Sequence, residues 1–125
     1  MNYKDTVLVS VIMPVYNGSN FLSDSIQGIL DQTHKNLEFL ILDDFSNDNS
    51  VEIIKKFKDK RIKLYTNNEN QGYVRGLNFL FKESKGQYIA RNDQDDFSIP
   101  NRLEIQLKLF KEHKGLSICG GQIET

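Results

Sequence analysis

Residues 86–102 read Gly-Gln-Tyr-Ile-Ala-Arg-Asn-Asp-Gln-Asp-Asp-Phe-Ser-Ile-Pro-Asn-Arg. The aromatic and β-branched residues at the start of this stretch favour a strand, and Pro100 suits the first turn of a helix, where its missing N–H needs no partner. Between them lie Asp93, Asp95 and Asp96, three carboxylates that repel one another. A folded chain that keeps such a cluster usually uses its charge, and an Asp-x-Asp pair suits Mg²⁺ or Mn²⁺ held together with substrate phosphates. On its own, however, an Asp-x-Asp is more often a solvated acidic turn.

Composition describes an ordinary domain with no strong charge. The chain has 125 residues, 16 basic against 17 acidic side chains and a single cysteine. This length suits one domain with a continuous core, and the balanced charge argues against a nucleic-acid binder that relies on bulk positive charge. Cys119 cannot form an intrachain disulfide, and no signal peptide or long apolar segment is recognisable, so we expect a cytoplasmic protein. His34 and His113 are expected to be solvated at helix ends.

Apolar runs and helical periodicities alternate along the chain. We predict helices over residues 21–32, 51–57, 73–83 and 100–113, and strands over residues 7–13, 37–42, 61–66, 87–91 and from residue 116, the first strand being ended by Pro14. This alternation with nearly all-apolar strands predicts an α/β fold, a Rossmann-like three-layer sandwich with a mainly parallel central sheet and helices on both faces.

In such a fold the loops after the strands meet at one edge of the sheet, where ligands bind. Those loops carry the segments Pro14–Asn17, Asp43–Asp44, Asn67–Gly72 and Asp93–Asp96. Neither a dinucleotide-binding glycine pattern nor a P-loop follows the first strand. Acids after the second strand and a metal-binding pair after the fourth fit a nucleoside diphosphate, whose base a carboxylate could bind while the diphosphate reaches a cation.

Four motifs in this order closely resemble family 2 glycosyltransferases of the GT-A fold, over Val7 to about Gln122. They are Val9–Asn17, Ile41–Asp48, Asn70–Gly72, and Tyr88–Asp96 followed by Ile99–Leu103. Enzymes of this family transfer a sugar from a nucleotide donor, commonly a UDP-sugar, with inversion at the anomeric carbon. Phe45 departs from the pattern, because a glycine is usual at its position.

The resemblance implies roles for individual residues. It assigns the nucleotide pocket to Pro14, Tyr16, Asn17, Asp43, Asp44 and Asp93. Asp44 would accept a hydrogen bond from the base, Asp93 would face the ribose and the metal, and Asp95 would be the direct Mn²⁺ or Mg²⁺ ligand. The metal would act as a Lewis acid on the leaving diphosphate. Arg102 could anchor the acidic loop by a bidentate salt bridge.

In similar enzymes the general base and the acceptor-binding elements lie well beyond the fifth strand, so the general base is expected beyond Thr125. The resemblance therefore implies that residues 1–125 form a single domain, the donor-binding portion of a longer enzyme, with no catalytic residue of their own and little sugar transfer. Two alternatives stay open. One is a non-catalytic nucleotide-sugar binding module. The other is a sugar-phosphate nucleotidyltransferase, which would normally carry a glycine-rich basic loop after the first strand.

The resemblance also implies partners beyond the donor. We expect a saccharide or lipid-linked acceptor in a bacterial envelope polysaccharide pathway, and no nucleic acid. Peripheral association of the full-length protein with the inner face of the membrane would fit such an acceptor. An unpaired edge at the last strand would favour a homodimer.

Overall fold

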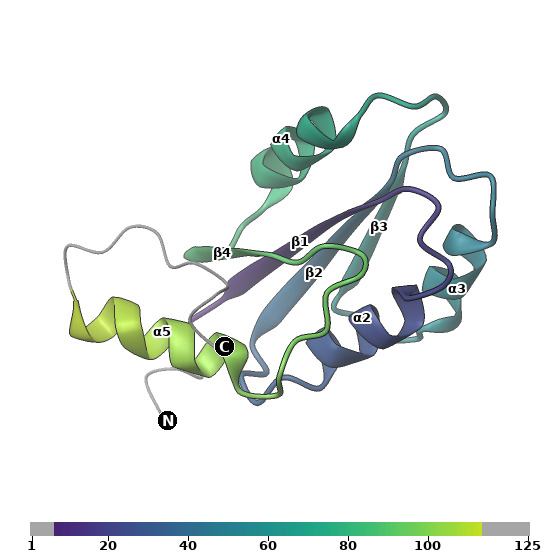
Figure 1. Ribbon diagram of the computed structural model, residues 1–125. Coiled ribbons are helices and arrows are strands. Elements are labelled where there is room, and N and C mark those ends of the chain that lie inside the picture. The colour runs from purple at the N-terminus through teal and green to yellow at the C-terminus, as the bar shows by residue number, and fades with distance from the viewer. Residues whose placement is uncertain (1–6, 114–125) are drawn as a thin grey trace.

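The computed structural model describes residues 7–113, which form alternating strands and helices (Figure 1). Each element predicted within these residues occurs, in the predicted order. In chain order the elements are β1 (Val9–Val15), α2 (Leu22–Leu30), β2 (Leu37–Asp43), α3 (Ser50–Lys56), β3 (Ile62–Thr66), α4 (Tyr73–Glu83), β4 (Tyr88–Arg91) and α5 (Arg102–Glu112).

Some of the predictions concern the end of the chain. The strand predicted from residue 116, the lone Cys119 and the chain end at Thr125 lie outside the described residues. The unpaired edge expected at that strand, and the homodimer that it would favour, therefore stay predictions.

The four described strands form one parallel sheet in the order β3-β2-β1-β4. β1 is central, and Val9 lies opposite Leu37 of β2 on one side and Tyr88 of β4 on the other. The chain builds the sheet outward from β1 to β3 and then returns to the free side of β1. The strand order thus reverses between β1 and β4, which is where a parallel sheet of this kind opens a crevice for a ligand.

Helices cover both faces of the sheet, which confirms the predicted three-layer α/β arrangement (Figure 1). On one face Val11 and Met13 of β1 pack with the buried residues of α2, α3 and α5. On the other face Ile12 packs with Leu80 of α4, because successive side chains of a strand point to opposite faces. No helix among residues 7–113 is long and apolar enough to cross a membrane.

The prediction that Pro14 ends the first strand is wrong, because β1 continues through Pro14 to Val15. Pro14 and Val15 still lie opposite Leu42 and Asp43 of β2. On the other side of β1, the pairing with β4 stops at Ile12, whose carbonyl accepts the N–H of Asn92 at 3.0 Å. The N–H that proline lacks would point to this second side, so Pro14 costs the sheet no bond to β2.

The last described helix begins at Arg102 rather than at Pro100. The first intrahelical bond runs from the N–H of Ile105 to the carbonyl of Asn101, at 3.0 Å. The carbonyl of Pro100 accepts instead the N–H of Thr33, at 2.8 Å, and so ties the loop to the end of α2.

The two histidines differ in exposure. His113 is exposed just after α5, as predicted, but His34 is not solvated, because only 2% of it is exposed. The Nε2 atom of His34 lies 2.8 Å from the carbonyl oxygen of Val7 and 3.0 Å from that of Asn36. These contacts place His34 inside the protein beside the start of β1. The prediction failed because it rested on position near a helix end, and that position says nothing of what packs there.

Glu38 organises a buried polar cluster at the amino end of the sheet. Its carboxylate accepts hydrogen bonds from the hydroxyl of Ser10 at 2.5 Å, the backbone N–H of Lys85 at 2.7 Å and the Nζ of Lys63 at 2.7 Å. The Ser10 hydroxyl in turn accepts the N–H of Gly86 at 2.8 Å. The turn between α4 and β4 is thereby held so close to β1 that a Cβ on Gly86 would lie 2.7 Å from backbone atoms of Leu8 and Ser10.

A Gly86→Ala variant should therefore be destabilised by about 1–3 kcal/mol, the usual cost of overpacking, because backbone atoms cannot move aside cheaply. Gly76→Ala is the matched control. Its Cβ would meet Leu42 and Pro14 side chains at ordinary contact distances of 3.4 Å and more, and alanine gains about 1 kcal/mol of helix propensity. Urea unfolding of both variants measures the difference. Equal stability of Gly86→Ala and the parent chain would contradict this packing.

Candidate functional site

Asp44 lies at the carboxyl end of the sheet and is only 6% exposed. Its Oδ1 accepts hydrogen bonds from Nδ2 of Asn67 at 2.9 Å and from the N–H of Gln71 at 2.8 Å, and its Oδ2 accepts the N–H of Gly72 at 2.9 Å. Burial is the largest influence on this carboxyl and opposes its ionisation, but the three hydrogen bonds together outweigh it, so the pKa of Asp44 lies below its usual value. The loop after β3 is thus folded around an ionised carboxylate.

Asp43 shapes the loop after β2. It is 2% exposed, and its two oxygens accept hydrogen bonds from the N–H of Ser46 at 2.9 Å and from the Ser46 hydroxyl at 2.6 Å. The turn from Asp43 to Ser46 places Phe45 in the left-handed region, with φ of 64°, and leaves this residue 55% exposed. A glycine, which the resemblance leads us to expect here, would adopt this conformation without strain.

The loop after β1 is joined to the loop after β2. The N–H of Asn17 donates to the Ser46 hydroxyl at 2.9 Å, and the Asn17 side chain accepts the N–H of Asn47 at 2.9 Å. Tyr16 is 46% exposed beside them, whereas Pro14 is buried within β1. Of the residues predicted for the nucleotide pocket, Tyr16 and Asn17 are therefore open to a ligand, while Pro14 and Asp43 support the loops from below.

Gln94 joins the acidic loop to the loop after β1. Its side-chain oxygen accepts the N–H of Tyr16 at 2.7 Å, and its Nε2 donates to the Tyr16 carbonyl at 3.1 Å. Gly18 lies so near that a Cβ there would be 2.7 Å from this oxygen. Gln94 was not among the predicted site residues, because the middle position of Asp-x-Asp carries no signal of its own. Only the proximity of the two loops across the reversal in strand order gives it a role.

The acidic loop is held by one of its own carboxylates. Asp96 accepts the N–H of Asp93 at 3.0 Å, and the N–H of Asp96 donates to the Asp93 carbonyl at 3.0 Å. One oxygen of the Asp93 side chain accepts the hydroxyl of Tyr73 at 2.7 Å. Burial and the hydrogen bond to Asp93 raise the pKa of Tyr73 to about 12, so its hydroxyl stays a donor. Asp95 is exposed and, within residues 7–113, makes no hydrogen bond or ion pair.

Behind the acidic loop, a buried polar core fixes its position. Asn92 is 0% exposed, and its side chain donates to the Ser25 hydroxyl at 2.9 Å and accepts hydrogen bonds from Ser98 at 3.0 Å and from Arg102 at 3.1 Å. Arg102 also donates to the carbonyl of Arg91 at 2.8 Å. Arg102 therefore anchors the loop, as expected, but through neutral oxygens rather than through the expected salt bridge to its carboxylates.

The described residues do not assemble a complete metal site. No group of three or more histidine, cysteine, aspartate or glutamate side chains within residues 7–113 is placed to hold an ion. The acidic loop offers instead Asp95, whose carboxylate is unengaged, and the second oxygen of Asp93. Two carboxylates of this kind fit Mg²⁺ or Mn²⁺ when substrate phosphates and water complete the shell. The donor set thus suits a cation that binds together with its substrate.

The described residues do not test where the general base expected from the resemblance lies. It was predicted beyond Thr125, and the structure describes the chain only to residue 113. The absence of a catalytic residue from this chain, and its low transfer activity, therefore stay predictions.

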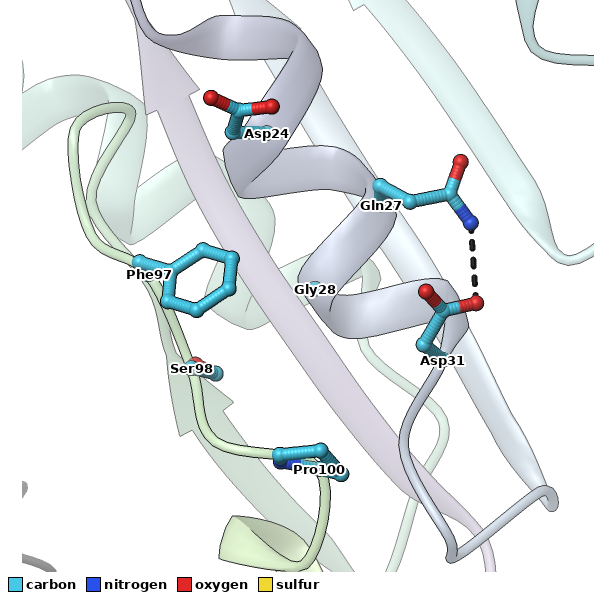
Figure 2. A pocket seen from close by; sticks show the side chains of 7 residues that line it. All are labelled: Asp24, Gln27, Gly28, Asp31, Phe97, Ser98 and Pro100. Carbon is cyan, nitrogen blue, oxygen red and sulfur yellow. Dashed lines mark hydrogen bonds between the residues drawn. The ribbon is translucent and has the colours of Figure 1, made fainter.

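A cavity of about 140 Å³ lies between α2 and the segment that leads into α5 (Figure 2). Its walls are Asp24, Gln27, Gly28, Asp31, Phe97, Ser98 and Pro100. The Phe97 ring faces the helix across this space, and Gln27 donates to Asp31 at 2.9 Å along the opposite wall (Figure 2). None of the predicted site residues lines the cavity, so it is separate from the edge at which the acids gather.

The hydrogen bonds to Asp44 predict a pH-dependent effect of Asp44→Asn. At pH 7 the variant should lose about 1–3 kcal/mol of unfolding free energy, because an amide cannot accept all three bonds. The pKa of Asp44 is lowered by folding, so its contribution is complete above the unfolded value of about 3.9 and disappears as the pH falls through the folded value. Urea unfolding should show the gap between variant and parent narrowing below about pH 4. A gap that stays constant down to pH 2 would contradict the prediction.

Known glycosyltransferases resemble this chain in sequence. The chain is 43% identical over 120 residues to the UDP-Glc:alpha-D-GlcNAc-diphosphoundecaprenol beta-1,3-glucosyltransferase WfgD of Escherichia coli, in an alignment that covers 96% of this chain and 47% of that protein. The chain spans about half or less of the length of the curated relatives that it matches most strongly.

Two solved structures share the fold. The S. aureus protein TarS, residues 1–349 in complex with UDP-GlcNAc, superposes with a TM-score of 0.80 at 21% identity, covering 94% of this chain and 38% of that one. The mannosyltransferase PcManGT from Pyrobaculum calidifontis, in complex with GDP-Man and Mn²⁺, gives a TM-score of 0.67 at 23% identity over 71% of this chain and 28% of that one. The family model described as glycosyl transferase family 2 matches residues 10–124. This chain therefore belongs to glycosyl transferase family 2.

Proposed function

We propose that this chain is the donor-binding part of an inverting glycosyltransferase and binds a nucleoside-diphosphate sugar, a UDP-sugar in the first instance, together with a divalent cation. The observation that carries the proposal is the pairing of two acid groups at one edge of the sheet. A buried, ionised Asp44 is joined by hydrogen-bonded loops to an acidic loop whose Asp95 is exposed and unengaged. Asp44 can accept a hydrogen bond from a nucleobase, and Asp95 can bind a metal ion that also binds the diphosphate.

The nucleoside end of the donor is assigned to the loops after β1 and β2. Three of the roughly four lone-pair positions of the Asp44 carboxylate are occupied by donors of the loop after β3, which leaves one to accept an N–H from a nucleobase. The exposed ring of Tyr16 offers an apolar face to that base, and Asn17 offers an amide nitrogen. Pro14 and Asp43 contribute through the loops that they support, and Asp93 faces the ribose.

The diphosphate end is assigned to the acidic loop. Asp95, assisted by Asp93, would hold Mn²⁺ or Mg²⁺. The cation supplies charge neutralisation for the departing diphosphate. Gln94 and Asp96 keep the loop in the conformation that presents the two carboxylates outward. Deprotonation of the acceptor is assigned to none of these residues, so the proposed part of this chain in the reaction is donor binding.

A lipid-linked saccharide is the proposed acceptor of the whole protein. The support is the name of the E. coli relative, which describes a sugar carried on diphosphoundecaprenol. Such an acceptor would bring the protein to the inner face of the membrane, on the cytoplasmic side where activated sugars are made.

Calorimetric titration with UDP, with and without Mn²⁺, tests the donor site. UDP should bind more tightly with Mn²⁺, and Asp95→Asn should remove most of that gain while leaving the metal-free affinity unchanged. Asp31→Asn is the matched control, because it removes an exposed carboxylate at the far end of α2.

Repeating the titration with GDP and dTDP identifies the donor class. Binding of none of the three nucleotides would sink the proposal. Binding without any response to Mn²⁺ or to Asp95→Asn would favour a nucleotide-sugar binding module without a metal.

A further inference from the structure

The first turn of α4 contacts both acid groups of the site. Gly72, just before the helix, donates its N–H to Oδ2 of Asp44 at 2.9 Å. Tyr73, the first helical residue, donates its hydroxyl to Oδ1 of Asp93 at 2.7 Å. Two consecutive residues thus connect the carboxylate proposed for the base with a carboxylate proposed for the metal. Gly72 ends the Asn70–Gly72 motif, whereas Tyr73 lies outside the four motifs.

The Asp93 backbone is fixed without any help from Tyr73. Its N–H donates to Asp96, and its carbonyl accepts hydrogen bonds from the Ser25 hydroxyl at 3.2 Å, the Asn92 side chain at 3.2 Å and the N–H of Asp96 at 3.0 Å. Within the described residues, Tyr73 is the only group that binds the Asp93 side chain. Its hydroxyl therefore controls one degree of freedom, the orientation of that carboxylate.

We propose that Tyr73 is a positioning residue that holds Oδ1 of Asp93, and so turns Oδ2 toward the cation bound with the donor. This inference rests on the proposed function. A hydrogen bond to one oxygen of a ligating carboxylate fixes which oxygen is free, and such outer contacts typically change metal affinity about 10–100-fold. The tyrosine is 47% exposed and lies at the end of a helix, so its hydroxyl is not needed to fill the core.

Tyr73→Phe removes the hydroxyl and keeps the ring. With UDP and Mn²⁺ the variant should bind about tenfold more weakly than the parent, whereas UDP without metal should bind both equally. Tyr65→Phe is the matched control, since Tyr65 lies on β3 at the opposite edge of the sheet and packs edge-on against Phe79. A merely structural hydroxyl would affect both titrations alike or neither. Unchanged or tighter Mn²⁺-dependent binding by Tyr73→Phe would overturn the inference.

A second measurement needs no nucleotide. Tb³⁺, a hard cation that prefers oxygen ligands, is titrated into each protein and followed by its own directly excited emission. Tyr73→Phe should require about tenfold more Tb³⁺ for saturation than the parent or Tyr65→Phe. Equal affinities, or no saturable binding by the parent, would overturn the inference. Weakened Tb³⁺ binding by the variant combined with no UDP binding by the parent would retain the role of Tyr73 and reject the proposed function.

Discussion

The site depends on the hydrogen bonds that the buried carboxylate of Asp44 accepts. A buried charge is stable only if hydrogen bonds replace the water that it has lost, and here the replacement comes from residues 67–72. The N–H groups of the loop after β3 keep the Asp44 carboxylate ionised. The same hydrogen bonds hold that loop in its conformation. The start of α4 is fixed by the same contacts, and with it the tyrosine that reaches Asp93.

Two kinds of connection make the remaining loops into one unit. Hydroxyl and amide side chains join the loop after β1 to that after β2, through Asn17 and Ser46. Gln94 lies on the other side of the reversal in strand order. It forms hydrogen bonds with both the N–H and the carbonyl of Tyr16. A ligand that binds the loops on either side of the strand-order reversal therefore meets loops that are already held in place. This lowers the conformational entropy that is lost on binding. Among the described acids at this edge of the sheet, Asp95 is exposed and makes no hydrogen bond or ion pair.

The sequence was sufficient to predict the features that depend on periodicity. Strand and helix types, the parallel sheet and the meeting of Asp44 with the acidic loop all follow from apolar spacing and from the handedness of crossovers. Features that depend on what lies across space were missed. His34 is buried beside Val7, and Gln94 matters because it binds Tyr16 in the opposite loop. Arg102 was identified as an anchor, but the contacts by which it holds the acidic loop are to neutral oxygens of Asn92 and Arg91, which no charge pattern reveals.

Pro14 shows how one residue of a central strand can determine where its neighbour must leave the sheet. The next rung of the ladder after the bond from Asn92 to Ile12 would need an N–H at position 14, and proline has none. The ladder between β4 and β1 ends at this bond, and the chain leaves the sheet after residue 92. The N–H that Pro14 lacks thus limits how far β4 pairs with β1. This limit determines the point along β1 at which the chain turns into the acidic residues, almost eighty positions later in the sequence.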